Sequence, residues 1–183
     1  YLKRRGITFD DVVRWKIGAC IEGKYKGRII IPSFGMDGKC NYFIARTYDK
    51  HPITYLNPPS VKDILFNELY IDWKKDVTIT EGVFDAIVAG NSIPILGSSL
   101  REESHIFQKI ALNTNKVYIA LDPDAEQKEN SIIKKFLSYG VSVFKIEVKP
   151  YKDIGCMTKE IFQDRKDNAI EISTANQIEI ALM

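Results

Sequence analysis

Short apolar segments alternate with amphipathic segments over the second half of the chain. The predicted strands cover residues 77–80, 93–96, 116–121 and 141–146, and the helices between them cover 83–89, 102–112 and 125–139. Short apolar strands joined by helices are typical of a parallel sheet with helices on both faces. In such sheets, ligands bind beyond the carboxyl ends of the strands. The pattern therefore indicates where to look for chemistry.

The first part of the chain has a different pattern. Residues 8–15 have helical spacing, with Thr8 as the expected N-cap. Apolar and β-branched residues predict a strand over Arg28–Phe34 and a returning strand over 41–46, joined by a tight turn. Three prolines within residues 51–60 exclude regular structure there, so this stretch is expected to be a connector.

Composition and charge narrow the class of protein. A chain of 183 residues, 45% of them hydrophobic, forms one core, or one core with a small appended lobe. Residues 1–75 carry fourteen Lys or Arg against eight Asp or Glu, and the remaining residues carry twelve against sixteen. This asymmetry suits a protein that holds a polyanion with one part and metal ions with another, and ordinary fluctuation of surface charge explains it equally well.

Several classes are excluded or disfavoured by what the sequence does not contain. No apolar stretch approaches the roughly 20 residues of a membrane span. The three cysteines of the chain are far apart in the sequence, so they predict neither a zinc ribbon nor a disulfide framework. This pattern indicates intracellular thiols. A chain that opens on Tyr1 reads as a fragment of a longer protein.

Two of the predicted strands end in carboxylates. Glu81 follows the first strand and Asp85 lies four residues later in the next helix, while Asp122 and Asp124 follow the third strand. If these two strands are neighbours, Glu81, Asp122 and Asp124 converge at one edge of the sheet. Carboxylate oxygens of this kind suit Mg²⁺ or Mn²⁺, which keep several waters and bind substrate phosphates.

Each acidic motif also has a structural explanation. Acidic residues in a first helical turn offset the helix dipole. Asp124, with Gln127 three residues later, also fits a capping box. Repulsion among four converging carboxylates would be costly without a cation, so the pair of motifs together favours metal binding.

The two acidic motifs carry a family resemblance. A strand followed by EGxxD and a helix, and then a strand followed by DxD, resembles the Toprim domain, which is shared by DnaG-like primases, topoisomerases, and OLD and RecR proteins. Further stretches, in the same order along the chain, resemble the primases in particular. These are GRIIIP at 27–32, FIAR at 43–46, YLNP at 55–58, LFN at 65–67, LGSSL at 96–100 and KD at 152–153.

Two departures from the primase pattern accompany this resemblance. The family often continues DxD with a small residue and glycine, whereas Ala125, Glu126 and Gln127 follow here. A family lysine that precedes the LFN-like element has its nearest counterpart in Lys62, which is slightly displaced. The short length and divergent links resemble phage members more than cellular ones.

The resemblance implies an α/β fold, with a Toprim-type parallel sheet flanked by helices on both faces and preceded by a smaller α+β primase amino-terminal lobe. The expected divisions are a basic lobe over 1–75, the Toprim domain over 76–157 and a carboxy-terminal helical segment over 158–183.

The resemblance also implies an activity, which is DNA-templated synthesis of RNA primers by metal-dependent nucleotidyl transfer. The expected catalytic residues are Glu81, Asp85, Asp122 and Asp124. The expected ligands of Mg²⁺ or Mn²⁺ are Glu81, Asp122, Asp124 and Asp153. The residues expected to grip nucleotide phosphates or template are Arg28, Arg46 and Lys62.

The expected partners of such a protein are a single-stranded DNA template, ribonucleoside triphosphates and a replicative helicase. A zinc-binding domain is expected upstream of this chain, and the expected location is the cytoplasm, of a host cell if the protein is phage-encoded.

Two other kinds of protein share parts of this pattern. A Toprim nuclease would have the same metal site, but the elements at 27–32 and 55–58 belong to the primase amino-terminal lobe. A topoisomerase needs a nucleophilic tyrosine in a separate domain, for which the chain has little room. A non-catalytic Toprim module that binds single-stranded DNA or a replisome partner would usually have lost the acidic residues that this chain retains.

Overall fold

The computed structural model describes residues 1–59 and 63–173 of the 183-residue chain. It contains two compact units, Tyr1–Tyr70 and Ile71–Met183. Their boundary lies a few residues before the one expected after residue 75. Within the described part, no helix is long and apolar enough to cross a membrane.

The first unit is built on a three-stranded antiparallel sheet in the order β1-β2-β3. Its elements are η1 (Lys3–Arg5), α1 (Phe9–Arg14), β1 (Gly18–Cys20), η2 (Gly23–Tyr25), β2 (Arg28–Phe34), β3 (Cys40–Thr47) and η3 (Glu68–Tyr70). Helix α1 begins where the sequence predicts, because the Thr8 hydroxyl accepts a hydrogen bond from the Asp11 N–H while the Asp11 carboxylate accepts one from the Thr8 N–H. The hairpin of β2 and β3 was also predicted, whereas the three-residue strand β1 was not.

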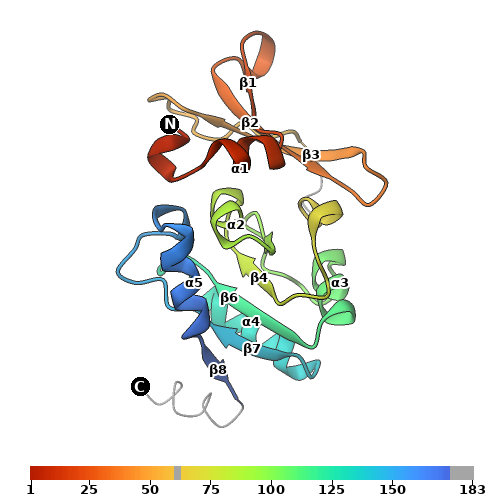
Figure 1. The fold of residues 1–183 in the computed structure, drawn as a ribbon. Coiled ribbons are helices and arrows are strands. Elements are labelled where there is room, and N and C mark those ends of the chain that lie inside the picture. Colours follow the sequence, from red (N-terminus) through yellow and green to blue (C-terminus); the bar gives the residue numbers. More distant parts are fainter. Residues whose placement is uncertain (60–62, 174–183) are drawn as a thin grey trace. The chain divides into compact units, whose positions relative to one another are not determined.

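The second unit is a five-stranded sheet in the order β5-β4-β6-β7-β8 (Figure 1). The first four strands are parallel and β8 is antiparallel to β7. Its strands are β4 (Val77–Thr80), β5 (Ser92–Pro94), β6 (Lys116–Ala120), β7 (Ser142–Lys145) and β8 (Ile170–Ile172). Its helices are α2 (Val83–Ala89), α3 (His105–Asn113), α4 (Glu126–Ser138), η4 (Ile154–Cys156) and α5 (Lys159–Asp167).

Helices cover both faces of this sheet, as the alternating pattern predicts. The chain leaves β4 in one direction along the sheet through α2 and leaves β6 in the opposite direction through α4. Right-handed crossovers therefore place α2 and α4 on opposite faces. Helix α5 packs on the α2 side, where Val88, Tyr118 and Phe162 share one buried cluster. Helices α3 and α4 meet through Phe107 and Phe136, whose ring centroids are 4.7 Å apart.

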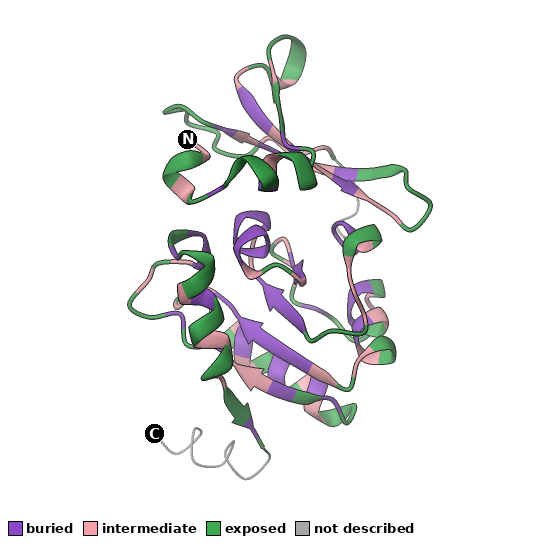
Figure 2. Cartoon of the chain, in the orientation of Figure 1, coloured by how far each residue is buried: buried purple, intermediate pink, exposed green. Residues whose placement is uncertain are grey.

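The two strands that carry the acidic motifs, β4 and β6, are almost wholly buried. All four residues of β4 are buried, as are the last four of β6, which Figure 2 shows in purple. Strands that are buried on both faces are uniformly apolar or β-branched, which explains why the sequence predicted them without alternation.

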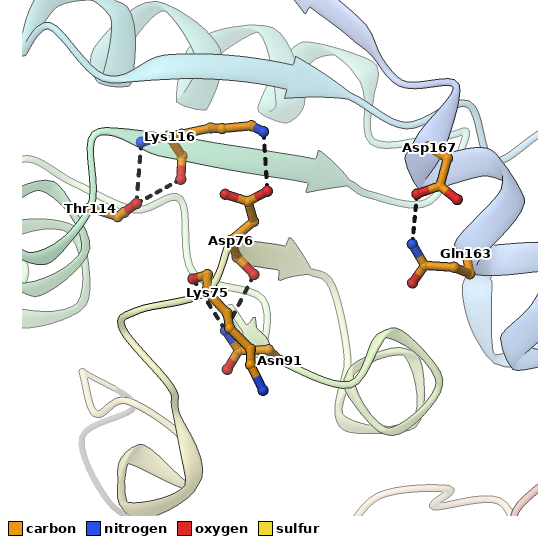
Figure 3. A network of polar contacts seen from close by, with 7 residues as sticks. All are labelled: Lys75, Asp76, Asn91, Thr114, Lys116, Gln163 and Asp167. Atoms are coloured by element: carbon orange, nitrogen blue, oxygen red, sulfur yellow. Dashed lines mark hydrogen bonds and ion pairs between the residues drawn. The ribbon is translucent and has the colours of Figure 1, made fainter.

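Polar contacts fasten the amino-terminal ends of β4 and β6 to one another (Figure 3). The Lys116 Nζ atom, at the start of β6, is 3.1 Å from an oxygen of Asp76, which precedes β4. The Asn91 side chain donates hydrogen bonds to the carbonyl groups of Asp72 and Asp76. These contacts stabilise the register of β4 and β6 at their amino-terminal ends.

The end of the chain differs in part from the helical segment expected over 158–183. Helix α5 is present, with Thr158 as its N-cap. After Asn168 the chain turns into β8, a strand of three residues that pairs with β7 at the edge of the sheet. Residues 174–183 lie outside the described residues.

Arg28 stabilises the first unit through buried hydrogen bonds. Its side chain is buried, with 4% of its surface exposed. The guanidinium donates hydrogen bonds of 3.0 Å to the Thr54 carbonyl and 2.8 Å to the Ile53 carbonyl. It therefore ties the proline-rich connector to the first residue of β2.

Replacing this arginine should destabilise the first unit. Arg28→Met keeps most of the side-chain volume but removes both hydrogen bonds, and we expect it to lower the free energy of unfolding by about 1–3 kcal/mol. Denaturant unfolding would measure the change, with the exposed Lys26→Met as the control of equal charge. An unchanged stability for Arg28→Met, together with weakened DNA binding, would assign this arginine to the nucleic acid instead.

Candidate active site

The two acidic motifs meet at the carboxyl edge of the second unit's sheet. Strands β4 and β6 are direct parallel neighbours, and Thr80 is opposite Ala120 in their register. Glu81 follows Thr80 at once, and Asp122 lies two residues after Ala120. The strand order also reverses between β4 and β6, and such a reversal opens a crevice for ligands at this edge. The predicted convergence of these strand ends is therefore present.

Asp122 experiences the negative charge of the whole cluster. Burial, followed by repulsion from four other carboxylates, raises the pKa of Asp122 from its ordinary 3.8 to about 7. These four carboxylates belong to Asp85, Glu81, Asp153 and Asp124. Every acidic residue that the sequence assigned to the site is thus close enough to act on Asp122. Without a cation, burial and this repulsion therefore favour the protonated form of Asp122.

The two oxygens of Glu81 have different surroundings. Oε1 is 2.5 Å from the Lys128 Nζ atom of α4. Oε2 is buried and, within the described part of the chain, accepts no hydrogen bond. The backbone of Glu81 is fixed as well, because its carbonyl accepts a hydrogen bond from the Leu96 N–H. The backbone of Glu81 is therefore held in place, while only one of its two carboxylate oxygens has a polar partner among the described residues.

Asp85 acts mainly as an organiser of the surrounding backbone. One of its oxygens accepts a hydrogen bond of 2.9 Å from the Gly82 N–H at the start of α2, and the other accepts one of 2.9 Å from the Gly155 N–H in η4. A Cβ atom at Gly82 would lie 3.1 Å from the nearer oxygen, so glycine is required here for close approach rather than for an unusual backbone angle. The structural explanation of the first acidic motif, in which an acidic residue stabilises the first turn of a helix, thus holds for Asp85.

The capping explanation does not hold for Asp124. Helix α4 begins at Glu126 with Ala125 as its N-cap, and no side chain caps it. The exposed Asp124 is therefore not a capping residue. Asp153 precedes η4 without capping it, and its buried Oδ1 atom accepts no hydrogen bond among the described residues.

The arrangement of the carboxylates decides what kind of divalent-ion site they can form. Among the described residues, no group of three or more Asp, Glu, His or Cys side chains is arranged to hold a metal ion alone. The set of Glu81, Asp122 and Asp124 is therefore not a closed cage. Mg²⁺, however, is commonly bound by one or two carboxylates, several waters and substrate phosphates. Glu81 and Asp153 each have one buried oxygen that accepts no hydrogen bond among the described residues, and both act on Asp122. This arrangement fits an open site of this kind.

A cleft of about 220 Å³ adjoins Asp122. It is lined partly by Glu129 and Lys145, whose oppositely charged groups are 2.7 Å apart, and by Lys149. Burial raises the pKa of Glu129, and the ammonium of Lys145 opposes this change. The cleft therefore presents both signs of charge beside the carboxylate cluster.

The three basic residues expected at the nucleic acid have different positions. Arg28 is buried beneath the connector, so its expected phosphate-binding role is not supported by its contacts. Arg46 is half-buried, donates a hydrogen bond to the Tyr55 hydroxyl and lies over the rings of Tyr55 and Tyr1, with its guanidinium carbon 4.8 and 5.5 Å from the ring centroids. Lys62 lies outside the described residues.

Sequence reasoning missed Lys128 and the pair of Glu129 and Lys145. Lys128 lies in the first turn of α4, and side chains on a helix lean toward its amino terminus, here the end of β6. A lysine in the first turn after the DxD motif was the available signal. Nothing local marks Lys145 as the partner of Glu129, because the two approach one another only when α4 packs beside β7.

The chain was compared with known proteins. It matches no protein-family model and no curated protein. Among solved structures it resembles the zinc-binding and RNA polymerase domains of the Aquifex aeolicus primase, with 20% identity and a TM-score of 0.76 over 94% of this chain and 55% of that one. It thus spans about half of that primase fragment.

Two further structures have the same fold. The DnaG primase catalytic domain bound to single-stranded DNA has 19% identity and a TM-score of 0.78 over 93% of this chain and 71% of that one. The primase fragment of the bacteriophage T7 primase-helicase protein has 14% identity and a TM-score of 0.68 over 91% of this chain and 71% of that one. The chain therefore has the fold of the DnaG primase catalytic core, and the likeness extends to both Aquifex aeolicus and phage T7.

The raised pKa of Asp122 predicts how stability depends on pH without metal. Because the folded pKa of about 7 exceeds the ordinary 3.8, the folded state binds more protons between these values, and stability falls as pH rises through this window. Asp122→Asn mimics the protonated group. In EDTA, we expect this variant to melt at a higher temperature than the parent at pH 8, with a smaller difference at pH 5.

The control for this prediction is Asp164→Asn, an exposed position on α5 of the same unit. We expect its melting temperature to follow the parent at both pH values. A constant difference between Asp122→Asn and the parent from pH 5 to 8 would show that Asp122 is ionised throughout, and hence that the carboxylates do not repel one another strongly.

Proposed function

We propose that this chain is the catalytic core of a DnaG-like DNA primase, which synthesises short RNA primers on single-stranded DNA from ribonucleoside triphosphates. One observation carries the proposal. Glu81 and Asp122 follow the neighbouring ends of β4 and β6, in a fold shared with primase catalytic cores. Burial, and then repulsion from Glu81 and three further carboxylates, raises the pKa of Asp122 to about 7. A metal-dependent polymerase uses such a concentration of carboxylates to hold its cations, whereas a binding module has no such need.

The cation for this site is Mg²⁺ or Mn²⁺, which would be held by Glu81, Asp122, Asp124 and Asp153 together with substrate phosphates. When bound, it would neutralise phosphate charge and lower the pKa of the attacking ribose hydroxyl. Asp85 would serve the reaction indirectly, by holding the Gly82 and Gly155 backbone and hence the position of its neighbours.

The first unit would bind the polyanion. Twelve Lys or Arg against seven Asp or Glu in residues 1–70 give it a net positive charge. Arg46 and the exposed Tyr55 together offer a cation beside an aromatic ring, a combination that suits a phosphate and an adjoining base. Lys62 remains a further proposed contact from the sequence.

The proposal extends to partners. The matched structures include a primase with a zinc-binding domain and the primase part of a primase-helicase protein. By analogy, we propose that a zinc-binding module and a replicative helicase act with this core during replication in the cytoplasm.

Removing metal-ligand charge should abolish priming and spare the fold. Glu81→Gln and Asp122→Asn are nearly isosteric, and each should lower primer synthesis about a hundredfold or more. The assay is incorporation of labelled ribonucleotides on mixed-sequence single-stranded DNA with Mg²⁺ or Mn²⁺, with a zinc-binding module supplied in trans. Asp164→Asn is the matched control and should prime like the parent. Variants that prime as well as the parent would show that these two carboxylates are structural, and an inactive parent would favour a Toprim-shaped binding domain.

Template binding should depend on salt through the first unit. Each phosphate contact releases counterions, so Arg46→Ala should weaken binding and reduce the slope of log affinity against log salt by about one. Fluorescence anisotropy with labelled single-stranded DNA at several salt concentrations would measure this slope. The exposed Lys26→Ala is the control for simple loss of charge. If both variants have the parent's slope, the template binds elsewhere.

A further inference from the structure

Lys128 forms the closest ion pair with a residue of the carboxylate cluster. Its Nζ atom is 2.5 Å from Glu81 Oε1, although the two residues are 47 positions apart in the chain. Both side chains are only about one quarter exposed, at 27% and 26%. An ion pair that is partly shielded from water interacts more strongly than one at the open surface.

The setting of this ion pair is unusual. Glu81 follows β4 and lies beside Asp122, which follows the neighbouring strand β6. The ammonium of Lys128 thus supplies positive charge at a cluster that is expected to hold a divalent cation. The next residue of α4, Glu129, forms an ion pair with Lys145. Lys128 and Lys145 therefore pair with different carboxylates.

We infer that Lys128 is a tethered counter-ion of Glu81, which occupies this carboxylate until a divalent ion displaces it. This inference rests on the proposed function and assigns a positioning and regulatory role to a residue outside the acidic motifs. Once a divalent ion has displaced Lys128 from Glu81, the lysine ammonium lies free beside the site. There it can form an ion pair with a phosphate of a bound nucleotide. Metal and nucleotide binding would then favour one another.

A purely structural lysine would behave in the opposite way. If Lys128 only holds Glu81 in the correct position, its removal should weaken binding of a divalent ion. If it competes with the ion for Glu81, its removal should strengthen binding, because both the competing ion pair and the repulsion between the ammonium and the metal are lost. The direction of the change therefore distinguishes the two roles.

The test uses the whole chain and Mn²⁺ alone, with bound ion measured by electron paramagnetic resonance or calorimetry. Lys128→Met should bind Mn²⁺ about three- to tenfold more tightly than the parent. Lys128→Arg keeps the charge and should resemble the parent. Lys134→Met removes an equal charge from an exposed position of the same helix and should change the affinity less than about twofold.

A second measurement follows the pair without metal. In EDTA, Lys128→Met should melt at a lower temperature than the parent because Glu81 loses its counter-ion. Adding Glu81→Gln to this variant should recover most of the loss, since the carboxylate is then uncharged. Purely additive effects in this double-mutant cycle would show that the two side chains are not coupled and would overturn the inference.

The outcomes separate this inference from the proposed function. If the parent binds Mn²⁺ and Lys128→Met binds it equally or more weakly, the counter-ion role is wrong and the primase proposal stands. If only Lys128→Met binds Mn²⁺ measurably, competition is strong and the inference is supported. If neither protein binds Mn²⁺, the metal-dependent function fails, and the inference fails with it.

Discussion

The parallel pairing of β4 with β6 is the contact on which the candidate site depends. Thr80 and Ala120 are opposite one another, so the residues that follow, Glu81 and Asp122, leave the sheet side by side. A slip of one residue would turn each side chain of the strand to the other face. The buried apolar side chains resist such a slip, and the ion pair of Asp76 and Lys116 fixes the opposite ends of the strands (Figure 3).

Bringing five carboxylates together carries an electrostatic cost, and the protein offsets it in three different ways. Burial and repulsion raise the pKa of Asp122 to about 7, which favours its uncharged form in the absence of a cation. Glu81 is paired with the ammonium of Lys128. Asp85 accepts hydrogen bonds from two backbone N–H groups. The first two of these can be exchanged for a cation, whereas the third is part of the fold. This difference is why Asp85 is a positioning residue and Glu81 and Asp122 are the better candidates for ligands.

The sequence predicted the strands and strand ends of the second unit because buried parallel strands are marked locally, by apolar runs that stop at glycine or an acidic residue. It did not predict β1 and β8, each of three residues, because such short edge strands form only when a longer neighbour is present. It did not predict the buried hydrogen bonds of Arg28 for a similar reason. An arginine beside an apolar run suggests an exposed charge, but its acceptors, the carbonyls of Ile53 and Thr54, lie about 25 residues further along the chain.

Helix α4 connects the site to the cleft beside it. Lys128 reaches the end of β4 through Glu81, and the adjacent Glu129 pairs with Lys145 at the end of β7. Glu129 also receives a hydrogen bond from the backbone of Leu121, the residue before Asp122. The first turns of one helix therefore contact the ends of three neighbouring strands. One helix therefore positions both the cation that pairs with Glu81 and the carboxylate that holds the backbone before Asp122.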